Sequence, residues 1–194
     1  MKLVPIFPLQ LIVFPFEELN LHIFEARYKQ LVQDCMANDL LFGIPFYREG
    51  IQLEYGSLVR IKEISKTYSD GKLDIKTVGV RPFELKRYRS TYPDKPYPAG
   101  YIKELYWEQE GDTDNRIRIR NLLKELYRFM NIKEAPKALE KEFLTFEIAH
   151  KVAFNIDQEY DLLKIISETE RQEFMIKHLV RMIPVIREAE EMRR

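Results

Sequence analysis

The segment FPLQLIVFPFEELNLHIFEARYKQLVQDC, Phe7–Cys35, joins an apolar run interrupted by prolines to the charged start of a helix. Its second half carries apolar residues at intervals of three and four: Phe24, Tyr28, Leu31, Val32 and Cys35. This spacing places side chains on one face of a helix. We therefore expect a helix from about Phe24 to Met36 with this face buried, and Cys35 as a buried small side chain rather than a reactive thiol.

Strand patterns surround this helix. Short apolar or alternating runs occur at Leu11–Phe14, Leu40–Phe46, Ser57–Thr67 and Leu73–Leu85. Between the last two runs, Ser69-Asp70-Gly71 supplies residues that tolerate positive φ. The first half of the chain is therefore predicted to be rich in strands, with a hairpin at Asp70-Gly71.

The periodicity becomes helical after residue 110. Asp112–Asp114 offer a cap and favourable negative charge for a first helix, and Pro136 suits the first turn of a second. A third helix is expected near Asp157. Ser167-Glu168-Thr169-Glu170 matches a capping box, so a last helix should begin there. Pro184 lies inside that helix and predicts a kink.

These patterns predict an α+β fold, β-rich over residues 1–110 and helical over residues 111–194. The chain has 194 residues, of which 45% are hydrophobic, and its net charge is zero. It is long enough to bury a core. Nonspecific nucleic-acid binding depends on Lys and Arg neutralising phosphates, so the charge balance argues against a general polyanion binder.

The composition also predicts where the protein works. One cysteine excludes an internal disulfide framework, and the three histidines are far apart in the sequence, so neither a metal site nor a cofactor is expected. Pro5, Pro8 and Pro15 interrupt the apolar N-terminal run, which argues against a signal sequence. No apolar run approaches the ~20 residues of a membrane helix. We expect a soluble cytoplasmic protein that does not bind membranes.

Motifs for catalysis are missing. The pair Gly71-Lys72 has Lys66 where a phosphate-binding loop requires its first glycine. His22, His150 and His178 lie in no motif that would set a base beside a Ser or Cys nucleophile. We therefore expect no catalytic residue and no enzymatic activity.

Five blocks follow one another along the chain: Phe7-Pro8-Leu9 with Phe14-Pro15; Leu21-His22-Ile23-Phe24-Glu25 with Arg27-Tyr28; Phe42-Gly43-Ile44; Gly56-Ser57-Leu58-Val59 leading to Val78-Gly79-Val80-Arg81-Pro82-Phe83; and Gln158-Glu159-Tyr160-Asp161-Leu162-Leu163. In this order they resemble the N-terminal, substrate-recognising domain of the Lon protease family over nearly the whole chain. The ATPase and Ser/Lys protease domains of that family have no counterpart here, so the resemblance is to a stand-alone recognition module.

The resemblance implies a PUA-like β-barrel subdomain followed by a helical bundle. It also implies recognition of unfolded or exposed hydrophobic polypeptide segments, or of a protein partner. RNA binding is the alternative, because the barrel resembles PUA domains. The motif residues are expected to be structural: Phe7, Pro8, Leu9, Phe14, Pro15, His22, Phe24, Glu25, Arg27, Tyr28, Gly43, Gly79 and Phe83.

Residues 88–100 combine aromatic rings with prolines after the basic run Lys86-Arg87-Tyr88-Arg89. Tyrosines on a proline-stiffened loop can contact apolar side chains of a client or stack on bases. We expect the ligand surface here, with four contact residues: Tyr88, Tyr92, Tyr97 and Tyr101. A basic row at every fourth position is expected to be a solvated helix face: Arg116, Arg120, Lys124 and Arg128.

Overall fold

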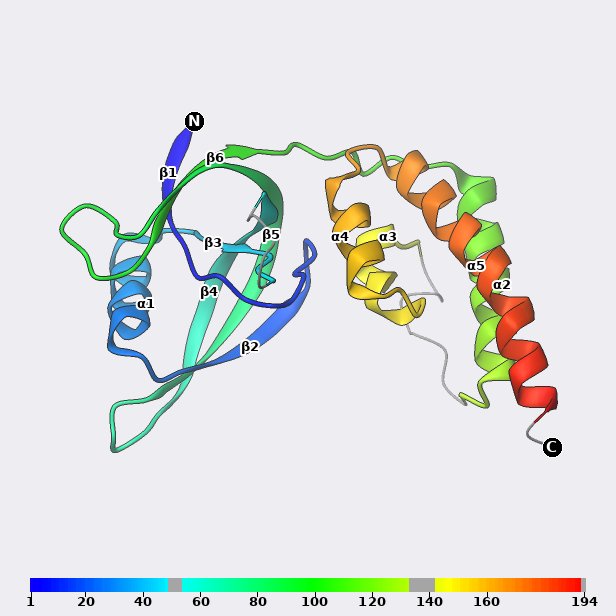
Figure 1. Cartoon of the computed structure of the whole chain (residues 1–194), viewed down its shortest axis with the longest axis horizontal. Coiled ribbons are helices and arrows are strands. Elements are labelled where there is room, and N and C mark those ends of the chain that lie inside the picture. Colours follow the sequence, from blue (N-terminus) through cyan, green and yellow to red (C-terminus); the bar gives the residue numbers. More distant parts are fainter. Residues whose placement is uncertain (49–53, 133–141, 193–194) are drawn as a thin grey trace. The chain divides into compact units, whose positions relative to one another are not determined.

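The computed structural model describes residues 1–48, 54–132 and 142–192 (Figure 1). The chain divides into two compact units, Met1–Tyr106 and Trp107–Arg194. The first holds all the described strands and one helix, and the second holds the remaining described helices. Trp107–Glu110, which we expected in the β-rich part, thus belong to the helical unit.

The first unit is built on an antiparallel sheet in the order β1-β6-β5-β4-β3. The strands are β1 (Lys2–Pro5), β2 (Glu18–Ile23), β3 (Phe42–Pro45), β4 (Tyr55–Thr67), β5 (Leu73–Arg89) and β6 (Ala99–Glu104). β2 pairs with the first half of β5 and β6 with its second half. Two isolated bridges, Ile6–Gly43 and Leu9–Phe46, connect the segment after β1 to the region of β3. The chain contains both strands and helices, which confirms the predicted α+β class. The order of strands describes an open sheet, and the PUA-like barrel stays a prediction.

The hairpin between β4 and β5 turns where the sequence predicted. Gly71 has φ +76°, and the amide of Gly71 donates to the carbonyl of Tyr68 at 2.9 Å. The predicted strand Leu11–Phe14 is wrong, because this segment is buried but is not part of the sheet. Its backbone bonds to side chains instead: Ser57 donates its hydroxyl to the carbonyl of Val13, and the Phe14 amide donates to Glu17 at 2.8 Å.

The helix α1 (Ala26–Asn38) buries four of the five residues that its sequence spacing placed on one face: Tyr28, Leu31, Val32 and Cys35. Phe24 is the exception, with 61% of its surface exposed. The strand β2 ends at Ile23, and the N-cap residue Glu25 still has an extended backbone. Side chains of an extended chain alternate, so burial of Ile23 turns Phe24 outward. The prediction that Phe24 packs in the core is wrong.

The helical unit contains α2 (Thr113–Phe129), α3 (Thr145–Ile148), the 3-10 turn η2 (Ala149–Lys151), α4 (Ile156–Lys164) and α5 (Glu168–Glu191). Asp112 caps α2 by accepting from the Asn115 amide at 2.7 Å. Ser167 caps α5 through the Glu170 amide at 3.5 Å. The helix predicted from Pro136 begins outside the described residues. Its described part is only the single turn α3 followed by η2, and Ala153 has a left-handed φ of 57° that ends the helical path.

A buried ion pair organises this unit. Arg171 and Glu168 have fully buried side chains and are 2.7 Å apart. Arg171 also donates to the carbonyls of Glu108, Ile165 and Ile166 at 2.6–2.7 Å, and its guanidinium lies over the Phe146 ring. Burial lowers the pKa of Arg171, while Glu168 opposes this effect. One side chain therefore ties three chain segments to α5.

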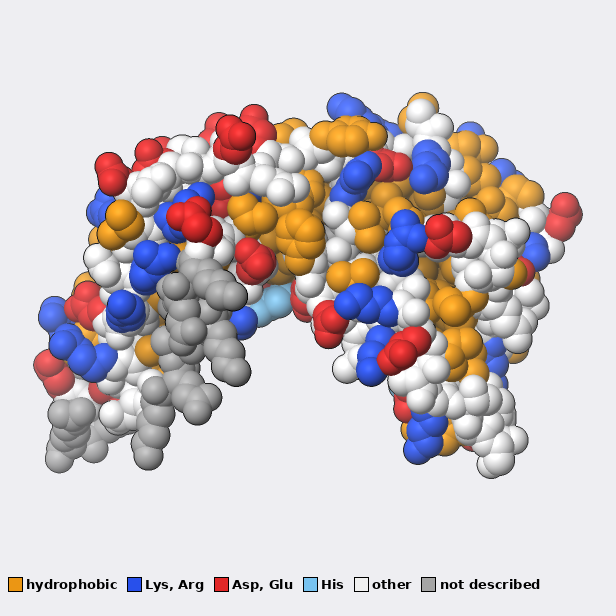
Figure 2. Space-filling view, turned by 180° about the vertical axis from the view of Figure 1, so that it is seen from behind, with side chains coloured by type: hydrophobic (Ala, Val, Ile, Leu, Met, Phe, Trp, Pro, Cys, Tyr) orange, Lys and Arg blue, Asp and Glu red, His pale blue; other side chains and the backbone are white. Residues whose placement is uncertain are grey.

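The basic row on α2 is not uniformly solvated. Arg116 is buried and pairs with Glu142, whereas Lys124 and Arg128 are exposed. On the side of the protein drawn in Figure 2, acidic and basic side chains are interspersed. Neither sign of charge covers that side alone.

Candidate functional site

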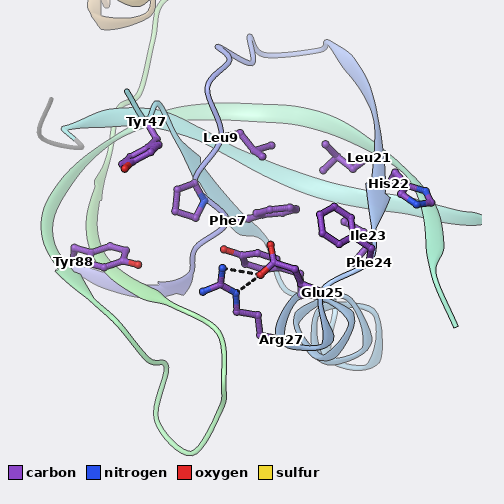
Figure 3. A pocket seen from close by; sticks show the side chains of 12 residues that line it. Phe7, Leu9, Leu21, His22, Ile23, Phe24, Glu25, Arg27, Tyr47 and Tyr88 are labelled. Carbon is purple, nitrogen blue, oxygen red and sulfur yellow. Dashed lines mark hydrogen bonds and ion pairs between the residues drawn. The ribbon is translucent and has the colours of Figure 1, made fainter. Parts of the chain in front are cut away.

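An open groove of about 560 Å³ lies in the β-rich unit (Figure 3). Eight of the motif residues line it: Phe7, Pro8, Leu9, His22, Phe24, Glu25, Arg27 and Tyr28. Leu21, Ile23, Tyr47 and Tyr88 complete the lining. The residues expected to be structural are thus partly surface residues of a concave site, which is the default place to look for a ligand.

The floor of the groove rests on the segment after β1. The Phe7 amide donates to the carbonyl of Gly43 at 2.8 Å, which fixes Phe7 beside β3. Its ring stacks on Tyr28 of α1, with the centroids 4.0 Å apart. A Cβ at Gly43 would lie 2.8 Å from the Ile6 side chain and 3.0 Å from the Phe83 ring. A side chain at position 43 would therefore require Ile6 or Phe83 to shift.

Aromatic side chains reach solvent along the groove. Phe24 is 61% exposed, Tyr88 44% and Tyr47 41%. Burial raises the pKa of Tyr28 and of Tyr88, so both phenols are uncharged at neutral pH. Tyr28, which is buried, and Phe7, which is half-buried, form a floor of rings with exposed rings around it. Aromatic rings offer a ligand a large apolar area at little cost in side-chain entropy.

The charges in the groove are already compensated. Arg27 donates through Nε and a terminal nitrogen to the same oxygen of Glu25, each at 2.8 Å, and its guanidinium lies 4.7 Å from the centre of the Tyr28 ring. His22 is 2.6 Å from Asp74. Hydrogen bonds from His22 and from Tyr68 lower the pKa of Asp74. The groove is therefore a mainly apolar surface whose charged residues Glu25 and Arg27 pair with each other, and whose His22 contacts Asp74.

The remaining motif residues support the unit from within. Phe14, Pro15, Gly43 and Phe83 are buried. Gly79 bonds the loop after Phe14 in both directions: its carbonyl accepts from the Phe16 amide and its amide donates to Glu17, each at 2.8 Å. This contact holds the Phe14-Pro15 segment against β5.

Of the four predicted contact tyrosines, Tyr97 is buried, Tyr92 and Tyr101 are half-buried, and Tyr88 is exposed. Tyr97 is 1% exposed and donates its hydroxyl to Asp34 at 2.8 Å. Tyr92 packs against the same core, with its ring centroid 5.7 Å from that of Tyr97. Tyr101 is half-buried in β6 between β1 and β5. Burial of Tyr97 contradicts its predicted availability to a ligand, and only Tyr88 of the four lines the groove.

Sequence reasoning missed the groove because it treated the motif block as packing. The signal was present in the alternation at the end of β2, where Ile23 points inward and Phe24 outward. The many prolines and tyrosines near Tyr97 do not show whether its ring is buried. Tyr97 packs against residues of α1 and donates to Asp34, which lie far away in the sequence.

The described parts of the chain lack the features of a metal site, a reactive thiol or a membrane-spanning helix. They contain no cluster of three or more His, Cys, Asp or Glu side chains able to hold a metal ion. Burial raises the pKa of Cys35 to about 12, so its thiol stays protonated and is not a nucleophile at neutral pH. None of the described helices is both long and apolar enough to span a membrane.

Fold and groove together describe a two-unit α+β module with a mainly apolar candidate site. Residues 3–181 match the family model of the ATP-dependent protease La (LON) substrate-binding domain, and the chain therefore belongs to this family. It is similar to the crystal structure of a Lon N-terminal domain protein from Xanthomonas campestris, with 24% identity and a TM-score of 0.70, over 91% of this chain and 98% of that one. It is also similar to the N-terminal domain of the Lon protease of Mycobacterium avium complex, with 15% identity and a TM-score of 0.66, over 92% and 98% of the two chains.

Proposed function

We propose that this chain is a non-catalytic module that binds exposed hydrophobic segments of unfolded polypeptide, and that the groove beside Phe24 receives them. The observation that carries the proposal is the exposure of Phe24, at 61%, next to the stacked rings of Phe7 and Tyr28. A large apolar side chain left in solvent beside an apolar hollow gains free energy when a ligand covers it, at ~25 cal/mol per Å². A cytoplasmic setting fits the single, unpaired Cys35.

The electrostatics of the groove favour polypeptide over RNA. Its only guanidinium, on Arg27, is paired with Glu25 and lies over Tyr28, and no lysine lines the groove among the described residues. A phosphate backbone would find no free cation there. Weak affinity is expected for an unfolded client, because the client loses conformational freedom on binding.

A titration of a dye-labelled, permanently unfolded protein, followed by fluorescence anisotropy, tests this proposal. Phe24→Ala should weaken binding about tenfold, or ~1.4 kcal/mol, with the thermal melt nearly unchanged. Tyr106→Ala is the matched control, because Tyr106 is also exposed, at 74%, in the same unit but outside the groove. Equal affinities for wild type and Phe24→Ala would refute the groove as the site.

The same titration with single-stranded RNA separates the two functions. RNA binding should fall steeply as salt rises, because counterions are released from phosphates, whereas apolar capture should change little. Binding of RNA alone, with a steep salt slope and no effect of Phe24→Ala, would overturn the polypeptide proposal.

A further inference from the structure

The helix α5 has two different long faces. One face is buried in the helical unit and carries Met175, Ile176, Leu179 and Ile183. The opposite face is exposed and carries residues at helical spacing: Lys177, Val180, Arg181, Pro184, Glu188 and Glu191. Val180 is 45% exposed, and Val185, which borders this row, is 63% exposed. We call the exposed row the outer face of α5.

From Lys177 onward, charge is segregated along the outer face, whereas the exposed Glu173 lies one turn before Lys177. Lys177 and Arg181 lie before Pro184, and Glu188 and Glu191 lie after it. None of these four side chains forms an ion pair or side-chain hydrogen bond within the described ranges 1–48, 54–132 and 142–192. Like charges three or four residues apart on a helix repel each other. The acidic end of the outer face is therefore unfavourable until opposite charges arrive, whereas the basic end already has Glu173 nearby.

The outer face is complementary to itself. When a second copy of the helix lies antiparallel, with the two Pro184 residues opposite each other, Lys177 meets Glu191 of the partner subunit and Arg181 meets Glu188 of the partner subunit. Twofold symmetry repeats both pairs, and the apolar residues around Pro184 meet at the axis. In a twofold symmetric (isologous) interface, the same surface patch of both subunits must be complementary to itself. We propose that the chain forms a homodimer through antiparallel pairing of the outer faces of α5.

Neighbouring side chains agree with this arrangement. Arg118 of α2 lines one hollow together with Lys177, Arg181 and the acidic Glu173, so this end, which meets the partner's acids, carries three cations and one acid. Arg187, the basic residue beside the acidic end, lies 5.8 Å from the centre of the Phe129 ring of α2 and is thus turned away from the outer face.

Another occupant fits less well. A nucleic acid or an acidic peptide would match Lys177 and Arg181 but would place its negative charges against Glu188 and Glu191. A second copy satisfies both ends at once. The proposal goes beyond client binding, since it uses no groove residue and its readout is the mass of the protein.

Sedimentation equilibrium of the full chain, over about 10 μM to 1 mM at low salt, tests the dimer. The wild type should shift with concentration from 23.3 kDa toward twice that mass. Lys177→Glu/Arg181→Glu should remain monomeric, and so should Glu188→Lys/Glu191→Lys. An equimolar mixture of these two variants should dimerise again, because every facing pair then has opposite charges.

Lys124→Glu/Arg128→Glu is the matched control, because it reverses two exposed cations with the same spacing on α2. It should dimerise like the wild type. Circular dichroism shows whether each variant is folded. A monomeric wild type at 1 mM, wild-type dimerisation of both α5 variants, or failure of the folded variants to pair with each other would overturn the proposal. Loss of RNA or acidic-peptide binding in Lys177→Glu/Arg181→Glu, with a monomeric wild type, would assign the face to that ligand instead.

Discussion

Gly79 lies directly beneath the carbonyl of Phe14, so close that a Cβ at this position would collide with the Phe14 oxygen and approach its carbonyl carbon to 2.9 Å. The contact joins the Phe14-Pro15 segment to the middle of β5. It explains in physical terms why a glycine lies between Val78 and Val80, two residues typical of strands.

Gly79→Ala should therefore destabilise the β-rich unit by roughly 1–3 kcal/mol, because the methyl group must displace backbone rather than a flexible side chain. Urea denaturation gives the free energy of unfolding. Gly71→Ala is an informative comparison: its position is open apart from the Lys29 amine at 3.5 Å, and its cost should come only from the positive φ of 76°. Equal stability of Gly79→Ala and wild type would contradict the close contact.

Tyr97 should behave as a core residue. Removing only its hydroxyl, in Tyr97→Phe, deletes the bond to Asp34 and should cost about 1 kcal/mol. Asp34 keeps Lys95 at 2.8 Å. Tyr97→Ala should cost roughly 3–5 kcal/mol through a cavity. Tyr88→Ala is the contrasting variant, since Tyr88 is 44% exposed in the groove and should lose client affinity with little change in the thermal melt. Loss of client affinity per folded molecule in Tyr97→Phe would restore Tyr97 as a ligand contact.

Replacement of Arg171 should disrupt the helical unit. Arg171→Ala leaves the carboxylate of Glu168 buried, with Thr145 as its remaining partner among the described residues, and should cost roughly 3–5 kcal/mol. Arg171→Ala with Glu168→Ala should be less harmful than the sum of the single variants, because the double variant leaves no unpaired buried charge. Chemical denaturation of the four proteins measures this coupling, and additive costs would show that the pair does not act as a unit.

Stability should fall in alkaline solution because of Cys35. Its pKa rises from 9.0 to about 12 on burial, so above pH 9 the unfolded chain loses the thiol proton more readily than the folded chain. The contribution of the Cys35 thiol to the free energy of unfolding is fully present below pH 9. Between pH 9 and 12 this contribution falls by up to about 1.4 kcal/mol per pH unit. Denaturation midpoints at pH 8 to 11 should decline less in Cys35→Ala than in the wild type. Parallel declines would show that Cys35 does not contribute.

The sequence alone predicted helix caps, the hairpin turn and the buried face of α1, because each depends on residues only a few positions apart. The cap of α2 is Asp112 acting on Asn115, the turn of the β4–β5 hairpin needs only Asp70-Gly71, and the buried face of α1 follows from the spacing of Tyr28, Leu31, Val32 and Cys35. Propensity, capping and periodicity act over one to four residues. They were sufficient for the α+β class and for most element positions.

Only the tertiary structure decided which aromatic residues are exposed. Tyr97 is buried because Asp34, 63 residues earlier, accepts its hydroxyl, and Phe24 is exposed because β2 pairs with β5 in a register that turns Ile23 inward. Both outcomes depend on contacts between distant segments, which local periodicity does not report. The groove exists for the same reason, since Phe7, Phe24 and Tyr88 come from three separate segments that only the folded sheet brings together.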